Sequence, residues 1–182
     1  VLENGRSSSY APYFDIDWRP LKSDLRDKVL IPILGDQYGR VLERGELKVH
    51  YDSGRFFLRY FDHEFPIAPG TYRHVLQLAL GQLRGHKEED FYAELQSILT
   101  ALEYLPRRTE QDPDRIAERA REKEIIKRRL ERRSQEAPPV QAAIEQALAI
   151  INGNVRDARS FDPLDERLGE QPFRPAFSLL AA

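Results

Sequence analysis

Two aspartates near the N-terminus are the first residues whose types and spacing could support chemistry. Asp15 and Asp17 stand two apart in "YFDIDW", so in an extended segment both side chains face the same side. Glycosidic chemistry needs two carboxylates about 5 Å apart for retention of configuration, or about 6.5–9.5 Å apart for inversion. With Tyr13 and Trp18 nearby, the pair could bind a sugar through hydroxyl hydrogen bonds and ring stacking. The alternative is that the aspartates fix loop turns or pair with neighbouring arginines, and spacing alone favours this alternative.

A run of basic residues is the second candidate. Residues 115–133 hold nine Lys or Arg and four Glu, a local net charge of +5, which is compatible with a helix that binds RNA or an acidic partner. However, Glu124 faces Arg128 at a spacing of four, and no aromatic residue is interleaved to stack on a base. A thin apolar stripe also runs along this helix, made of Ile116, Ala120, Ile126 and Leu130. An ordinary charged surface helix is therefore the favoured interpretation, and nucleic acid is an unlikely partner.

Histidines and nucleophiles supply no further site. The four histidines (His50, His63, His74 and His86) are dispersed, and no two have the spacing that places them on one helix face. Asp62 and Glu64 flank His63, but successive residues of a strand point to opposite faces and cannot converge on a metal. No serine lies in a nucleophile-elbow context and no phosphate-binding loop is present. The sequence predicts neither a metal site nor a cofactor.

The composition limits the class of protein. The chain has 182 residues, a net charge of -2, and neither Cys nor Met. No apolar run approaches the roughly 20 residues that a membrane helix needs, so we expect no membrane association. The absence of Cys excludes disulfides and fits a cytoplasmic location. The start at Val1, without Met, suggests a processed N-terminus or a segment of a larger protein.

Turn signals and alternation predict β structure in residues 1–69. Residues 28–34 form a short apolar run, but Pro32 restricts it to an edge strand or an extended segment. Residues 35–46 ("GDQYGRVLERGE") are expected to form consecutive turns. From Leu47 to Tyr60 hydrophobic and polar residues alternate on both sides of Asp52-Ser53-Gly54, which predicts a β-hairpin.

Helical periodicity dominates residues 70–182. The sequence predicts a helix capped by Thr71 and stopped near Gly85, and another in which apolar residues recur at alternating steps of four and three from Phe91 to Leu105. Three more helices are expected. Two start at Asp112-Pro113 and Pro138-Pro139, the latter followed by Gly153, and a short one starts at Asp162-Pro163. The expected fold class is α+β, mainly α, with a small β-hairpin region on the N-terminal side followed by a bundle of about five helices.

Three ordered motifs give the chain a specific resemblance. The stretches "VLENGRSSSYAPYFDIDW", "LIPILGDQYGRVLERGELKV" and "RYFDHEFPIAPGTY" occur in this order within residues 1–72. Together they resemble the maltooligosyl trehalose synthases of the α-amylase superfamily. The resemblance is weaker in the helices and recurs at "SFDPLDERLGEQPFR", residues 160–174.

The resemblance implies an intramolecular transglucosylase, an isomerase of trehalose biosynthesis. Such enzymes convert the reducing-end α-1,4 linkage of a maltooligosaccharide into an α,α-1,1 linkage. Their catalytic domain is a (β/α)₈ barrel with its active site at the C-terminal ends of the strands. The chemistry uses an Asp nucleophile, a Glu acid/base and a second, supporting Asp, in a retaining mechanism.

None of the family's catalytic motifs occurs in this chain, so no catalytic residue can be assigned to it. The chain instead resembles the insertion between the third and fourth barrel strands. The implied partners are the remainder of the barrel and a maltooligosaccharide, and the implied substrate-binding residues are Tyr13, Asp15, Asp17 and Trp18. The C-terminus departs from the family, because Pro175, Ser178 and Leu179 stand where the family has Leu, Trp and Arg.

Overall fold

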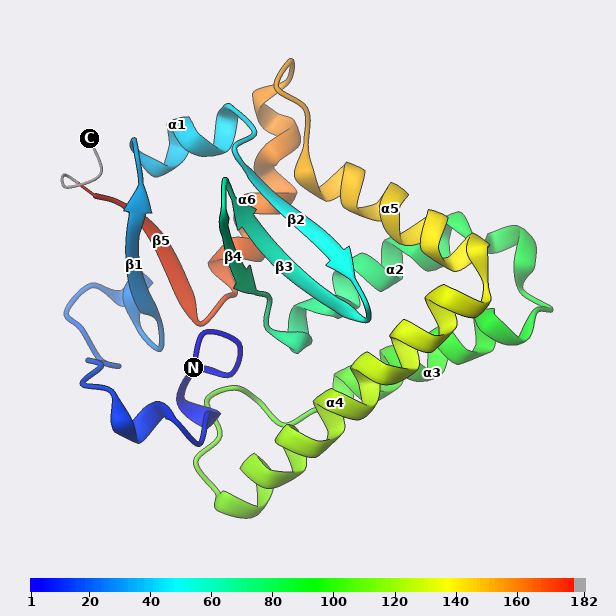
Figure 1. The fold of residues 1–182 in the computed structure, drawn as a ribbon, viewed down its shortest axis with the longest axis horizontal. Coiled ribbons are helices and arrows are strands. Elements are labelled where there is room, and N and C mark those ends of the chain that lie inside the picture. Colours follow the sequence, from blue (N-terminus) through cyan, green and yellow to red (C-terminus); the bar gives the residue numbers. More distant parts are fainter. Residues whose placement is uncertain (179–182) are drawn as a thin grey trace.

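The chain combines two small sheets with a larger set of helices, which confirms the predicted α+β, mainly α fold class. The computed structural model describes residues 1–178. Figure 1 shows a two-stranded sheet at one end, a three-stranded sheet in the centre and long helices on the other side. The strands are β1 (Val29–Leu34), β2 (Leu47–Asp52), β3 (Arg55–Tyr60), β4 (His63–Pro66) and β5 (Phe173–Phe177). The main helices are α1 (Tyr38–Glu43), α2 (Tyr72–Gln82), α3 (Asp90–Tyr104), α4 (Pro113–Glu136), α5 (Pro138–Asn152) and α6 (Asp162–Gly169).

The predicted β-hairpin is confirmed and is extended by a third strand. β2 and β3 are antiparallel, with Asp52 opposite Arg55, and β4 pairs with the other side of β3. The two turn residues, Ser53 and Gly54, both have positive φ values, of 49° and 78°. Two left-handed residues form the type I′ turn, whose twist matches that of the strands. The inward face of this sheet is hydrophobic and the outward face carries polar side chains.

β1 and β5 form a separate parallel sheet that brings the C-terminal strand of the described chain beside residues 29–34. Val29 lies opposite Phe173, and Pro32 lies opposite Ala176. The predicted extended segment at residues 28–34 is thus confirmed as a strand. The sequence did not indicate β5, so the predicted helical region 70–182 also contains one strand. Pro175 belongs to this strand, while Leu179 lies outside the described residues.

The prediction of consecutive turns at residues 35–46 was wrong in its centre, where α1 forms. Val41 and Leu42 are buried in the common core, and Gly45, with φ +67°, follows the helix. Burial of two adjacent apolar residues against the rest of the molecule stabilises this short helix. The composition of residues 35–46, which is typical of turns, does not indicate these tertiary contacts.

The helices of the second half agree well with the predicted faces. Leu95, Ile98 and Leu102 of α3 are buried, as are the predicted inward residues of α5. Asp112 caps α4 by accepting a hydrogen bond from the backbone N–H of Asp114, and Pro113 follows it at the first helical position. α2 and α5 pack together behind the three-stranded sheet, and α3 pairs with α4 (Figure 1).

The predicted ends of two helices are only partly confirmed. Thr71 occupies the N-cap position of α2, as predicted, but its side chain makes no capping hydrogen bond to the helix; its hydroxyl donates to the carbonyl of Ala68. The helix ends at Gln82, before Gly85, and a short 3₁₀ turn follows. In α6, Asp162 is the first helical residue and Phe161 occupies the capping position.

Candidate functional site

The N-terminal segment exposes three aromatic rings to solvent. Tyr10, Tyr13 and Phe14 are 67%, 82% and 59% exposed, while Ala11 between them is buried and holds the short 3₁₀ turn Ala11–Tyr13 against the molecule. Core packing therefore does not account for these rings. A cluster of exposed aromatic side chains is a feature of surfaces that bind ligands or other proteins.

The predicted substrate-binding residues Tyr13, Asp15, Asp17 and Trp18 all lie on this segment. Asp15 and Asp17 are exposed, and Trp18 is half-buried. Asp17 accepts a hydrogen bond from the backbone N–H of Arg19 at 2.9 Å, and the carbonyl of Trp18 accepts one from Asp27. Asp17 therefore stabilises a local turn, while its exposure leaves it accessible to a ligand.

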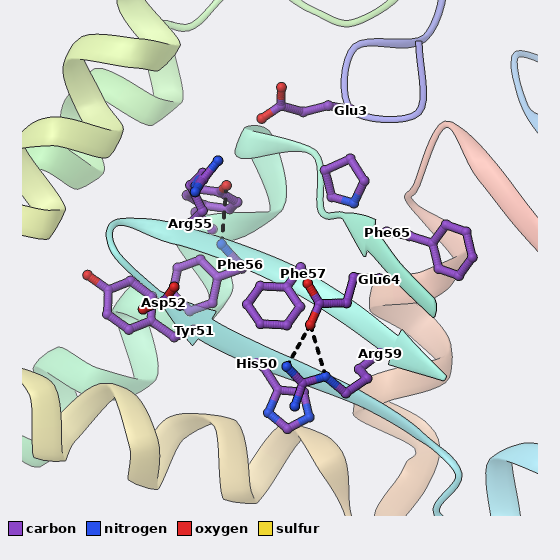
Figure 2. Close-up of a pocket in the computed structure, with 12 residues that line it drawn as sticks. Glu3, His50, Tyr51, Asp52, Arg55, Phe56, Phe57, Arg59, Glu64 and Phe65 are labelled. Atoms are coloured by element: carbon purple, nitrogen blue, oxygen red, sulfur yellow. Dashed lines mark hydrogen bonds and ion pairs between the residues drawn. The ribbon is translucent and has the colours of Figure 1, made fainter. Parts of the chain in front are cut away.

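A groove of about 550 Å³ runs along the outward face of the three-stranded sheet (Figure 2). The side chains of His50, Phe57, Arg59 and Glu64 lie side by side on this face because their positions are paired across the strands. Glu3, from the N-terminal loop, lies at the far end of the groove.

Stacked rings and an ion pair organise this groove. The rings of His50 and Phe57 stack with centroids 5.7 Å apart, and the Arg59 guanidinium lies 5.3 Å from the centre of the Phe57 ring. Arg59 Nη2 is 2.6 Å from Glu64 Oε1. Burial and the neighbouring Arg59 and Lys48 lower the pKa of His50, so its imidazole is neutral at pH 7. The groove therefore presents an aromatic face bordered by an ion pair.

An ion cluster fixes the N-terminal loop between the groove and α4. Glu3 pairs with Lys127 through one carboxylate oxygen and with Lys123 through the other, at 2.8 Å for Lys123. All three side chains are largely buried, and Glu124 on the same helix also contacts both lysines. The predicted contact of Glu124 with Arg128 was wrong, because the lysines that turn toward Glu3 engage Glu124 instead.

Acidic neighbours pair with most of the basic residues of the 115–133 stretch. Arg115, Arg121, Arg129 and Arg132 each contact a glutamate, in addition to the buried lysines. Within the described residues Arg128 remains exposed, with no ion pair. This charge neutralisation weighs against the nucleic-acid alternative, since few free cations remain to contact phosphates.

The apolar stripe predicted for this helix was only partly correct. Ile126 and Leu130 are buried, but Ala120 is exposed. Two cations, Arg119 and Lys127, are buried on the same side of the helix. Sequence reasoning placed them on the surface.

Residues 1–178 contain no cluster of three or more His, Asp or Glu side chains that could hold a metal ion. His63 is exposed, and burial together with Arg167 and Arg73 lowers the pKa of His74 to about 4. Within the same residues, no helix is long and apolar enough to cross a membrane.

Comparisons with protein-family models, with curated proteins and with solved structures gave no match. The class of this protein therefore rests on the residues and geometry described above.

Sequence reasoning missed the sheet groove and the buried cation Arg119. A signal existed for the groove, because alternation along β3 leaves Phe57 outward among polar residues. A signal also existed for Arg119, which lies three residues after Ile116 and seven before Ile126, on the helix face that carries the stripe.

Proposed function

We propose that this chain forms part of the substrate-binding wall of an enzyme of the α-amylase superfamily similar to the maltooligosyl trehalose synthases. In this proposal it contributes a saccharide-binding surface at Tyr13, Asp15, Asp17 and Trp18 and no catalytic residue. The observation that supports the proposal most strongly is the set of exposed rings beside two exposed carboxylates.

The chemistry of this segment matches a maltooligosaccharide. The C–H faces of a glucose ring are apolar and stack on exposed aromatic rings such as Tyr13 and Phe14, while the ring hydroxyls donate hydrogen bonds to carboxylates such as Asp15. The outward face of the three-stranded sheet offers a second aromatic platform at Phe57. A wall that covers the substrate also excludes water, which favours transfer over hydrolysis.

The two-stranded sheet supports the proposal that the remainder of a barrel packs on this chain. Parallel sheets normally have both faces covered, and isolated two-stranded sheets are marginally stable. Within the described residues β1 and β5 pair only with each other, and Leu30 and Phe177 are exposed on them. We propose that neighbouring barrel elements cover these residues, and that the parent enzyme is cytoplasmic, as the absence of Cys suggests.

Titration with maltopentaose tests the saccharide surface. Trp18 is the only tryptophan, so its fluorescence reports directly on the proposed segment. Tyr13→Ala should weaken binding about fivefold, the effect of removing one ring contact worth about 1 kcal/mol. Tyr104→Ala, which removes an equally exposed ring from the end of α3, is the matched control and should bind as the wild type does. No fluorescence change up to about 10 mM, or equal affinity of both variants, would contradict the proposal.

Incubation with maltopentaose tests the proposal that this chain is catalytically inactive on its own. The isolated chain should leave the number of reducing ends unchanged, because the proposal places all catalytic acids in the remainder of the enzyme. Turnover that survives purification and is lost on Asp15→Asn would instead assign a catalytic role to this segment.

A further inference from the structure

Arg119 is a buried cation without a counter-ion. It is only 4% exposed, and its Nη1 donates a hydrogen bond to the carbonyl of Pro106. Its buried Nε has no hydrogen-bond acceptor within residues 1–178, and Arg119 forms no ion pair there. Burial lowers the pKa of Arg119 to about 10, so the side chain remains charged at neutral pH.

Glu3 is the carboxylate that most favours the charged form of Arg119, but it is already engaged. Its two oxygens pair with Lys123 and Lys127. A buried charge that is not paired is costly, and buried donors are satisfied in almost all folded proteins. The guanidinium therefore has both a charge and an unpaired Nε–H with which it can bind an external anion.

A cavity of about 780 Å³ adjoins Arg119, between the N-terminal segment and the first turns of α4. Lys123 and its partner Glu3 also line the cavity, and the buried Asn4 Oδ1 has no partner within the described residues. The remaining wall is largely apolar and is formed by Leu2, Tyr10, Ile116, Ala117 and Ala120. The cavity therefore has the unpaired charge of Arg119 on one side and an apolar surface on the other, and it is far larger than an inorganic ion.

We propose that this cavity binds a small organic oxyanion. The carboxylate or phosphate group of the ligand pairs with Arg119, and its apolar body lies along Ile116 and Ala120. The paired N–H groups of a guanidinium match the two oxygens of either group. This inference does not depend on the saccharide surface, because an uncharged sugar cannot neutralise Arg119.

Calorimetric titration of the full chain with four probes tests the proposal. Phenyl phosphate and benzoate each carry both parts of the expected ligand, inorganic phosphate carries only the charge, and benzyl alcohol only the ring. At least one of the two aromatic anions should bind, at least about fivefold more tightly than inorganic phosphate, because it also buries its ring. The stronger of the two identifies the charged group, and benzyl alcohol should show no binding.

Variants of α4 locate the site. Arg119→Gln should weaken binding of the aromatic anion about tenfold or more, since it removes a charge-assisted hydrogen bond. Arg121→Gln is the matched control, because Arg121 is exposed and pairs with Glu122 away from the cavity lining. Its affinity should equal that of the wild type.

Two further measurements cover the possibility that Arg119→Gln does not fold. Ala120→Phe fills the apolar side without altering the guanidinium and should also abolish binding of the aromatic anion. In the wild type, the side-chain Nε signal of Arg119 in a nitrogen-15 NMR spectrum should shift on titration. The proposal is overturned by equal binding of wild type and Arg119→Gln, by benzyl alcohol binding as well as the anions, or by no binding of either aromatic anion at about 10 mM.

Discussion

Glu3 shows how one residue determines the position of a whole segment. Its carboxylate holds two lysines of α4 and lies at the end of the sheet groove. Burial alone would raise the pKa of Glu3, but hydrogen bonds from Lys123 and Lys127 outweigh this effect and hold the pKa below its ordinary value. The ion cluster thus stabilises the folded protein only while Glu3 is charged.

Glu3→Gln should lower the free energy of unfolding by roughly 3 kcal/mol, because it leaves two largely buried ammonium groups with only the half-exposed Glu124 as a partner. Urea denaturation at neutral pH measures the change. Glu136→Gln is the control. Glu136 and Arg132, both on α4, form an exposed ion pair, so this substitution should change the free energy of unfolding little. Equal destabilisation by the two substitutions would show that the Glu3 cluster has no special role.

The same cluster predicts a dependence on pH. Because the pKa of Glu3 is lower in the folded state than the ordinary 4.5, the unfolded chain binds more protons in that range. The contribution of Glu3 is complete above pH 4.5 and is lost as the pH falls through the folded value. The difference in stability between wild type and Glu3→Gln should therefore shrink in urea titrations below about pH 4.5. A constant difference from neutral to acid pH would contradict this expectation.

At the scale of elements, the hairpin turn couples the central sheet to α4. Gly54 has a positive φ, and a Cβ atom at this position would lie 2.1 Å from the carbonyl oxygen of Lys127. The turn therefore requires glycine for two independent reasons, its backbone conformation and the proximity of a helix backbone.

Gly54→Ala should destabilise the protein by roughly 2 kcal/mol or more, because the turn must either change conformation or move away from α4. Gly39→Ala is the matched control. Gly39 lies within α1 with no atom within 4 Å of an added Cβ, so alanine should stabilise by about 0.5–1 kcal/mol. Thermal unfolding distinguishes the two, and a tolerated Gly54→Ala would show that the contact with α4 is easily displaced.

At the scale of the whole molecule, one buried side chain links segments far apart in sequence. Gln171, fully buried just before β5, accepts a hydrogen bond from the backbone N–H of Ala68 at 2.8 Å. Its amide nitrogen donates to Thr71 Oγ1 and to the carbonyl of Arg167. Gln171 thereby ties the start of α2 to the end of α6 and positions β5 beside β1.

Gln171→Leu should cost about 2–3 kcal/mol of unfolding free energy, because it leaves the buried N–H of Ala68 without an acceptor. Hydrogen exchange should show faster exchange at Ala68 and along the β1–β5 pairing. Gln96→Leu, on the exposed face of α3, should change neither quantity. Unchanged exchange at Ala68 in Gln171→Leu would mean that another group replaces the lost acceptor.

The sequence by itself determined the elements that local patterns specify. The faces of α3 and α5, the cap at Asp112 and the hairpin with its Ser53-Gly54 turn follow from periodicity and turn chemistry within a few neighbouring residues. The four predicted binding residues lie on one segment because they are close neighbours in the sequence, residues 13–18. Which of them face solvent could not be predicted, because exposure depends on what packs against that segment.

Only the tertiary structure decided the pairing of β5 with β1, the helix at α1, and the burial of Arg119 and Lys127. Each of these depends on a partner distant in the chain, and a local pattern carries no information about that partner. Lys127 is buried because Glu3 reaches it, and Arg119 is buried without such a carboxylate. Sequence periodicity places Arg119 on the face of the apolar stripe but does not show how deeply either cation is buried. Because the N-terminal segment packs on α4, Lys127 forms an ion pair with Glu3, whereas Arg119 faces a cavity.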